Sequence, residues 1–424
     1  MKILLLGGGG REHALAWKLS QSSNCEEIFI APGNAGTESH GTNVNLDIHN
    51  NEAVGQFCLD NTIDMLVIGP EDPLVNGLQD YFKNNDSLNA VLVIGPSAEA
   101  AQLEGSKAFA KQFMERHSIP TAAYKEFTIE NFREGLAHIK RQSLPIVLKA
   151  DGLAAGKGVI IAQSHEEAKD AFTEMVQNKK FGTASSKVVI EQFLDGIEMS
   201  VFALTDGKNY CLLPNAKDYK RIGEGDTGLN TGGMGAISPV PFADDAFMKK
   251  VEDQIVKPTI SGIHKEGFDY VGFVFFGLIK VGDEPYVIEY NCRLGDPETE
   301  VILPRIENDL VQLFSLAATK KINEAKVKIK ADHCATVILV SGGYPEAYQK
   351  GKAIKGLDAN EHSIIFHAGT KMEDKNVLTN GGRVLAISSM GQGLKEAISS
   401  SYATIDSLCF EDMYFRKDIG YEFL

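Results

Sequence analysis

The first hundred residues constrain the fold most strongly, because four short apolar runs alternate there with helical patterns. The runs are KILLLGG, EIFIAPG, DMLVIGP and AVLVIGP, and each ends in Gly or Pro. Continuous apolar runs of this length are typical of strands in a parallel sheet that helices cover on both faces. We therefore expect a doubly wound parallel sheet at the N-terminus. A ligand of such a sheet binds beyond the carboxyl ends of its strands.

Composition excludes several classes of function. The 424 residues carry a net charge of −15, which disfavours nonspecific binding to nucleic acid or to anionic membranes. The six cysteines are scattered without a C-x-x-C pair, and the apolar stretch YVGFVFFGLIKVG is far shorter than a membrane span. The apolar run at the N-terminus is too short for a signal peptide. We expect a cytoplasmic protein with no nucleic-acid or membrane partner, in which any phosphorylated ligand meets a local positive site.

The stretch GGGGREH after the first strand resembles a dinucleotide-binding turn, but it departs from G-x-G-x-x-G. Gly7 and Gly9 fit, whereas Glu12 stands at the third glycine position. The next strand ends at Ala31 and Pro32 without a carboxylate that could hold a ribose. This argues against a nicotinamide cofactor. A phosphate or sugar over free N–H groups at the helix start, and a plain tight turn, both remain open.

Residues 149–161, KADGLAAGKGVII, look at first like a phosphate-binding P-loop. Gly152 and Gly156 are one residue too close for that motif, and Gly158 stands where Ser or Thr would follow Lys157. The flanking residues predict strands, so the loop should cap a hairpin. A glycine-rich loop of this kind should be mobile and could fold over a polyphosphate. A plain flexible turn fits the residues equally well.

The stretch YVIEYNC predicts a strand whose side chains alternate between two faces. Val287, Glu289 and Asn291 should therefore share one face. A carboxylate and an amide oxygen, with ligand phosphates completing the shell, suit Mg²⁺. A strand end that faces solvent is the alternative.

Six further positions are each too common in ordinary structural roles to indicate a function alone. Lys107 lies early in a helix that we expect to run from Ser97 to Pro120, and Lys149 ends a strand. Either lysine could be solvated. Glu191 ends another strand before Phe193 and Leu194, where backbone groups could contact an adenine, and Glu198 could lie near a ribose; ordinary strand and turn roles are as plausible.

Together, these features resemble the ATP-grasp superfamily and, within it, the phosphoribosylamine–glycine ligase family. The matching stretches span the chain in order and include APGNAGT, GPEDPLVNG, QLEGSKAFAK, DTGLNTGGMGAISP, RLGDPETE, HAGTK, TNGGRVL and RKDIGY. RLGDPETE is the most specific of them. One departure is that Lys217-Asp218-Tyr219-Lys220-Arg221 replaces the Gln-Asp-His-Lys-Arg that is frequent in the family, which puts a role for a histidine there in doubt.

The resemblance implies an α/β and α+β multidomain fold. It divides the chain into an N-terminal substrate domain at 1–101, a two-part ATP-grasp domain at 102–190 and 191–326, and a small mixed β/α domain at 327–424. It also implies ATP-dependent joining of glycine to 5-phosphoribosylamine through glycyl phosphate in purine synthesis. Mg²⁺ or Mn²⁺ would assist, and we expect a monomer.

The resemblance assigns residues to each role. ATP contacts are expected at Lys107, Lys149, Gly152, Gly156, Gly158, Glu191, Phe193, Leu194 and Glu198, and metal contacts at Glu289 and Asn291. Catalytic roles are expected for Arg293, Lys157 and Asp218, because the chemistry needs charge stabilisation and no protein nucleophile. Phosphoribosylamine is expected at Gly9, Arg11, Asn34, Gly36, Glu71 and Asp296.

Two alternatives remain open. Another ATP-grasp ligase that forms a carboxyphosphate or formyl phosphate is the nearer one, and RLGDPETE argues against it. The other is a nucleotide sensor without catalytic activity, against which the joint presence of Lys107, Lys149, Glu289 and Asn291 argues. ATP turnover with and without glycine would separate the three possibilities.

Overall fold

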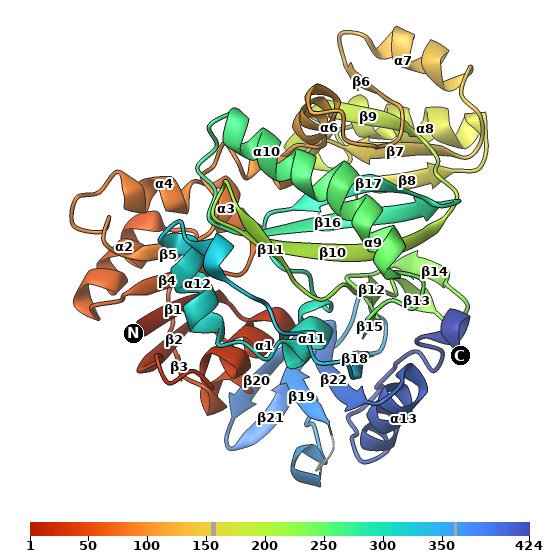
Figure 1. Cartoon of the computed structure of the whole chain (residues 1–424). Helices are drawn as coiled ribbons and strands as arrows, with labels where there is room; N and C mark the ends of the chain where they lie inside the picture. Colours follow the sequence, from red (N-terminus) through yellow and green to blue (C-terminus); the bar gives the residue numbers. More distant parts are fainter. Residues whose placement is uncertain (154–157, 360–362) are drawn as a thin grey trace.

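The structure is a computed structural model that describes residues 1–153, 158–359 and 363–424 (Figure 1). Gly156 and Lys157 therefore lie outside the described residues. None of the helices in the described ranges is both long and apolar enough to cross a membrane. Short 3₁₀ turns lie at Thr37–Ser39, Gly182–Ser186, Leu303–Arg305, Ile322–Glu324, Leu357–Ala359 and Tyr421–Phe423.

The N-terminal residues form the doubly wound parallel sheet that the sequence predicts. Its strands are β1 (Lys2–Gly7), β2 (Glu27–Pro32), β3 (Thr42–Asn43), β4 (Met65–Ile68) and β5 (Leu92–Ile94), in the order β3-β2-β1-β4-β5 with every pair parallel. Ile3 and Leu5 enter one hydrophobic cluster with α1 (Gly10–Leu19) and α12 (Leu310–Ala318). Leu4 and Leu6 enter another with α2 (Asn51–Asp60) and α4 (Leu78–Lys83). Helices thus cover both faces of the sheet.

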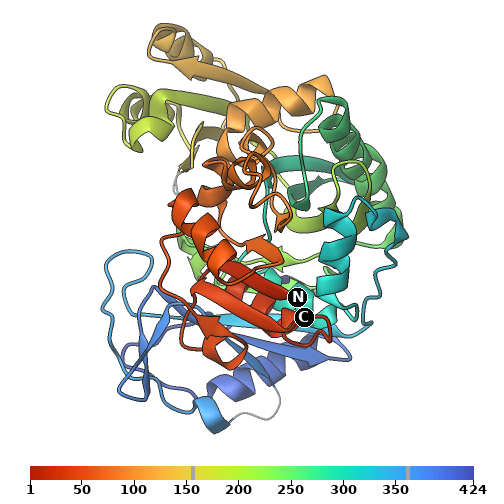
Figure 2. The ribbon, with the colours of Figure 1, turned by 90° about the vertical axis from the view of Figure 1, so that its left-hand side faces the viewer.

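A small antiparallel sheet carries the glycine-rich stretch. Its strands are β6 (Tyr124–Thr128), β7 (Ile146–Ala150), β8 (Val159–Ala162) and β9 (Lys187–Gln192), in the order β6-β9-β7-β8. Lys149 pairs with Val159, which confirms the predicted hairpin of β7 and β8. The sheet packs on α7 (Phe132–Ile139) and α8 (His165–Val176) around a hydrophobic cluster of its own. In Figures 1 and 2 this unit projects from the top of the molecule.

A second antiparallel sheet lies beneath that unit, in the order β11-β10-β16-β17. Its strands are β10 (Ile197–Thr205), β11 (Tyr210–Leu212), β16 (Gly272–Val281) and β17 (Glu284–Asn291), and β16 and β17 form the predicted hairpin. Figure 1 shows α9 (Asp245–Val251) and α10 (Lys257–Lys265) lying across it, joined by a π-helical segment, Glu252–Val256. Apolar residues of these helices share a cluster with Leu4 and Leu6, so the core is continuous with that of the N-terminal sheet.

The remaining sheet is built from two regions of the chain. Its order is β12-β15-β18-β22-β19, with β12 (Lys217–Asp218), β15 (Gly235–Ser238), β18 (His333–Val340), β19 (Ile364–His367) and β22 (Arg383–Gly391), and α13 (Leu394–Ile405) packs on it. Two hairpins accompany it, β13 (Arg221–Gly223) with β14 (Thr227–Asn230) and β20 (Thr370–Glu373) with β21 (Asn376–Thr379). Two short helices complete the fold, α3 (Glu71–Val75) and α11 (Thr299–Ile302).

The prediction of a single helix from Ser97 to Pro120 is wrong, because the helical segment is interrupted at Ser106. There, α5 (Gln102–Gly105) ends and α6 (Lys107–Arg116) begins. Ser106 has extended backbone dihedrals, and its hydroxyl accepts a hydrogen bond from the Phe109 amide at 3.1 Å. The same hydroxyl donates to the Asp151 carboxylate at 3.0 Å, and the Ala108 amide donates to that carboxylate at 2.7 Å. Asp151, at the end of β7, therefore fixes the start of the helix that carries Lys107.

Ser106→Ala should lower the free energy of unfolding by about 1 kcal/mol, because it removes an N-cap. In an uninterrupted helix the same change would be neutral or stabilising, since Ala is the better helix former. Chemical denaturation would measure the difference. Ser164→Ala, which removes the corresponding cap of α8, is the positive control, and Ser399→Ala inside α13 is the control for helix propensity. Unchanged or increased stability of Ser106→Ala would contradict the cap.

Candidate active site

A pocket of about 170 Å³ lies where α6, the β7–β8 loop, β9 and β17 meet. The pocket wall includes the expected ATP-site residues Lys107, Gly158 and Glu191, the expected metal ligands Glu289 and Asn291, and also Glu71 and Arg293. Residues separated by more than two hundred positions in the chain thus converge, and the pocket reaches from the ATP-grasp elements to the tip of the N-terminal sheet.

A bulge in β17 shapes one wall of the pocket. Gly277 of β16 pairs with Glu289, but the next residue, Leu278, pairs with Val287, so Ile288 has no partner on the neighbouring strand. Glu289 and Asn291 both face the pocket, as predicted. Val287 does not share their face, because it joins the same hydrophobic cluster as Tyr290. The extra residue reverses the alternation and turns the Ile288 carbonyl toward Lys149, whose ammonium donates to it at 3.1 Å.

Positive charge surrounds the Glu289 carboxylate. Burial alone would raise the pKa of Glu289, but Lys220, Lys107 and Lys149 outweigh burial and lower it. Glu289 is therefore an anion in a positive field, beside the amide of Asn291. Among the described residues, no group of three or more His, Cys, Asp and Glu side chains could hold a metal ion. A carboxylate and an amide suit a hard cation that takes most of its ligands from phosphate and water.

Lys149 and Lys111 share the carboxylate of Glu191. The two ammonium groups lie 3.1 Å and 3.0 Å from Glu191 Oε2, and all three side chains are buried. Burial is the main cause that lowers the pKa of Lys111, to about 8, and the attraction of Glu191 opposes it only in part. The Glu191 side chain is thus engaged with two lysines. The sequence analysis missed Lys111, although it follows Lys107 by four residues and so lies on the same face of the helix.

The other nucleotide positions lie around this wall. Phe193 and Leu194 follow β9 and are half-buried. Glu198 forms an ion pair with Lys220, which lowers the pKa of Glu198. Burial raises the pKa of Asp218, against the attraction of Lys220. Gly152 packs so closely on Ala184 that an added Cβ would lie 2.9 Å from the Ala184 Cβ.

Arg293 links β17 to the N-terminal elements. Its guanidinium lies 2.7 Å from Glu104 Oε1 and 3.5 Å from Glu71 Oε2. Burial raises the pKa of Glu104, whereas the arginines Arg293 and Arg11 overcome burial and lower the pKa of Glu71. Glu104, which no pattern in the sequence indicated, also accepts a hydrogen bond from the Cys292 amide at 2.7 Å. Arg293 is thereby held between two carboxylates at the pocket wall.

The start of α1 differs from the expectation of free N–H groups. The Gly9 amide donates to Glu12 Oε2 at 2.7 Å, and the Arg11 amide donates to Asp296 Oδ2 at 3.3 Å. Glu12 therefore folds back over the position that a phosphate would need in a dinucleotide-binding turn. Asp296 also lies 3.0 Å from Arg383, and both Arg383 and Arg11 lower its pKa against the effect of burial.

Asn34 and Gly36 have structural contacts in this region. The Asn34 amide donates to the carbonyls of Gly8 and His367, and its oxygen accepts from the amides of Gly36 and Thr37. An added Cβ at Gly36 would lie 2.2 Å from the His13 ring. These two residues therefore fix the loop after β2 against the C-terminal sheet.

Tyr219, at the position of the frequent family histidine, is turned away from the pocket. Its side chain is buried, and its hydroxyl donates to Glu422 near the C-terminus at 2.7 Å. Lys217 lies 2.9 Å from the same carboxylate. Lys217 and Tyr219, the two residues that differ from the frequent family pattern, thus both contact Glu422.

Comparison with known proteins agrees with this site. Three domains of phosphoribosylglycinamide synthetase match the chain: the N domain at residues 1–104, the ATP-grasp (A) domain at 105–299 and the C domain at 334–422. The phosphoribosylamine–glycine ligase of Vibrio parahaemolyticus is 45% identical over 99% of this chain and 98% of its own length. That of Pseudomonas aeruginosa is 44% identical over the same shares.

Solved structures agree as well. The crystal structure of phosphoribosylamine–glycine ligase from Thermotoga maritima has a TM-score of 0.85 and 36% identity, and covers 99% of this chain and 100% of its own. A biotin carboxylase from Campylobacter jejuni has a TM-score of 0.74 at 15% identity, covering 97% of this chain and 92% of its own, which shows a shared fold alone. The chain belongs to the phosphoribosylglycinamide synthetase family and is an ATP-grasp ligase.

Proposed function

We propose that this chain joins glycine to 5-phosphoribosylamine and converts ATP to ADP and phosphate, producing glycinamide ribonucleotide for purine synthesis. The observation that carries the proposal is the position of Arg293, at the wall of the ATP-grasp pocket and in contact with Glu71 of the N-terminal domain. In the proposal, a nucleotide site and a separate acceptor site would meet there. The phosphoribosylamine–glycine ligase of Vibrio parahaemolyticus is 45% identical over 99% of this chain.

In this proposal, lysines and glycines hold the ATP phosphates. Lys107 and Lys149 contact them directly, and Gly152 and Gly158 let the loop backbone approach; Gly156 and Lys157 would complete the loop. The adenine lies at the turn of Glu191, Phe193 and Leu194, and the ribose lies near Glu198. The positive charges of Lys107, Lys149 and Arg293 stabilise the charge that develops on the transferred phosphoryl group.

Glu289 and Asn291 would hold Mg²⁺ or Mn²⁺ in the same pocket. The ion, when bound, supplies positive charge to the phosphate oxygens. The carboxylate of glycine then attacks the γ-phosphate of ATP, which releases ADP and forms glycyl phosphate. Arg293 stabilises the anionic intermediate through its guanidinium. The amine of phosphoribosylamine displaces phosphate and forms the amide, and the excess proton passes to phosphate or water.

Phosphoribosylamine would lie at the tips of the N-terminal sheet. Gly9, Arg11, Asp296 and Glu71 line its proposed site, while Asn34 and Gly36 give the site its shape. Asp218 would border the cleft from β12. We expect the enzyme to act in the cytoplasm as a monomer.

ADP release should require glycine and phosphoribosylamine together. The test is a coupled ADP assay with each substrate omitted in turn, followed by mass-spectrometric identification of the product. ADP release without glycine but with bicarbonate or formate would support a different ATP-grasp ligase. ATP binding without turnover under every condition would support a nucleotide sensor.

Glu289→Gln should lower kcat/KM by roughly 100-fold, because the metal site loses its only proposed carboxylate. The reaction is measured across a titration of Mg²⁺ and of Mn²⁺. Glu284→Gln is the matched control, since Glu284 lies on the same strand but is exposed and paired with Lys250. Near-normal turnover of Glu289→Gln at saturating metal would remove Glu289 from the metal site.

The value of kcat/KM for ATP should fall as the pH rises through about 8. Below that pH, Lys111 is protonated and shares Glu191 with Lys149. Above it, Lys111 is neutral, and Glu191 withdraws the charge of Lys149 from the phosphates. Because kcat/KM reports groups of the free enzyme, its pH profile measures this titration.

Lys111→Met should abolish this alkaline decline and hold kcat/KM below pH 8 near the low value that the wild type reaches at alkaline pH. Lys249→Met, at an exposed position on α9, should keep the decline. A decline of the same midpoint in Lys111→Met would assign the titration to another group.

A further inference from the structure

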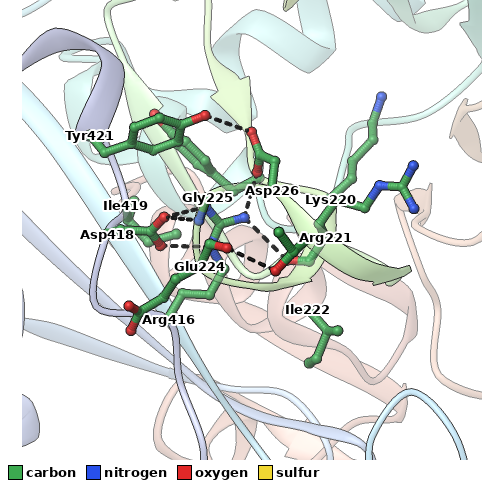
Figure 3. A network of polar contacts seen from close by, with 12 residues as sticks. Lys220, Arg221, Ile222, Glu224, Gly225, Asp226, Arg416, Asp418, Ile419 and Tyr421 are labelled. Atoms are coloured by element: carbon green, nitrogen blue, oxygen red, sulfur yellow. Dashed lines mark hydrogen bonds and ion pairs between the residues drawn. The ribbon is translucent and has the colours of Figure 1, made fainter.

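The C-terminal residues Tyr414–Glu422 hold the β13–β14 hairpin through a buried arginine. The Arg416 side chain is fully buried, and its guanidinium lies 2.6 Å from Asp226 in the turn of the hairpin. It also donates to the Arg221 carbonyl at 3.2 Å and forms two 2.8 Å hydrogen bonds with Asp418. Figure 3 shows these contacts converging on the turn of the hairpin. A buried, always-charged guanidinium with several fixed partners defines a geometry that a flexible surface pair would not.

Further contacts from the same segment fasten the hairpin along its length. The Tyr414 hydroxyl donates to the Ile222 carbonyl at 2.9 Å, and the Tyr421 hydroxyl donates to Asp226 Oδ2 at 3.1 Å. The Gly225 amide donates to Asp418 Oδ2 at 2.7 Å. By contrast, the four residues of β14 are all exposed. The hairpin therefore depends on polar contacts with the C-terminal segment and has little apolar packing of its own.

The base of the hairpin is Lys220, which reaches the active site. The Lys220 carbonyl accepts hydrogen bonds from the amide and the hydroxyl of Thr231, both at 2.8 Å, which closes the base. Its ammonium pairs with Glu198, and its positive charge contributes to lowering the pKa of Glu289. In Figure 3 the Lys220 side chain points away from the Arg416 network. Arg416 thus holds the backbone of the hairpin, and the Lys220 side chain extends from the base of that hairpin toward Glu198.

We propose that Arg416 is a positioning residue of the ATP-dependent reaction, which it serves by clamping the β13–β14 hairpin so that Lys220 stays paired with Glu198. The inference rests on the proposed function for its readout. It gives a role in the reaction to RKDIGY and to the DTGLN stretch, which lie outside the pocket wall. At the other end of the C-terminal segment, Glu422 forms an ion pair with Lys217 and accepts a hydrogen bond from Tyr219.

The test is a double-mutant cycle between the clamp and Lys220. Asp226→Asn removes the negative charge of a partly exposed partner of Arg416 and leaves the buried arginine in place. It should lower kcat/KM for ATP by about tenfold in the wild-type background. In a Lys220→Ala background the same change should lower kcat/KM by less than about twofold, because the group that the clamp positions is already absent. Equal losses in the two backgrounds would overturn the proposal.

Two controls separate positioning from general stability. Asp253→Asn breaks exposed ion pairs with Lys249 and Lys257 at a comparable exposure, and should leave kcat/KM unchanged. Hydrogen exchange should become faster in residues 221–230 of Asp226→Asn and stay unchanged in β16 and β17. Unchanged exchange in the hairpin would contradict the clamp.

Tyr421→Phe provides a second route if Asp226→Asn folds poorly. It removes one hydrogen bond to Asp226 and should lower kcat/KM in the same direction by about twofold, again only when Lys220 is present. An equal effect with and without Lys220 would overturn the proposal. A wild-type enzyme without glycine-dependent ADP release would instead refute the proposed function, which this cycle distinguishes from failure of the clamp.

Discussion

The partly buried carboxylate of Glu289 is the constraint on which the rest of the site depends. An anion that loses part of its hydration is stable only if cations compensate the loss. The compensating groups come from separate elements: Lys107 from α6, Lys149 from β7 and Lys220 from the base of a hairpin. In a chain of net charge −15, these three lysines concentrate positive charge at one carboxylate. The same lysines that keep Glu289 ionised can also bind a polyphosphate. The charges that stabilise Glu289 in the folded protein are therefore the charges that would bind the ligand.

Partly buried ion pairs also join the domains at their polar boundaries. Arg293 pairs with Glu71 and Glu104, while Arg383 pairs with Asp296, which also accepts a hydrogen bond from the Arg11 amide. Such pairs add little net stability compared with apolar packing, because both ions lose water. Their value is geometric, since an arginine fork accepts few orientations of its partners. We infer that these pairs fix how the tip of the N-terminal sheet faces the ATP-grasp pocket, a relation that apolar contacts would define less sharply.

Local patterns in the sequence were sufficient where the structure is local. Continuous apolar runs predicted the parallel sheet, strand patterns on both sides of the glycine-rich stretch predicted the β7–β8 hairpin, and alternation placed Glu289 and Asn291 on one face. The failures arose from partners distant in the chain. The break at Ser106 depends on Asp151, and the face of Val287 depends on a bulge against Gly277. Neither interaction leaves a periodic signal. Lys111 was within reach, because it shares a helix face with Lys107, but its pairing with Glu191 was not.

Apolar contacts hold each part of the pocket together internally, whereas polar contacts connect the parts across the pocket. The β6–β9 sheet has its own hydrophobic cluster, so Lys149 and Glu191 are carried by one compact unit. The contacts of that unit across the pocket are polar, namely Glu191 to Lys111 and Lys149 to the Ile288 carbonyl. Polar contacts can be exchanged for contacts with a charged ligand at small net cost, whereas apolar packing cannot. A phosphate that enters between Lys149 and Lys107 would replace bonds of the same kind. The unit can therefore keep its internal packing while it adjusts to the ligand, and the bulge at Ile288 supplies the carbonyl that holds Lys149 when no phosphate does.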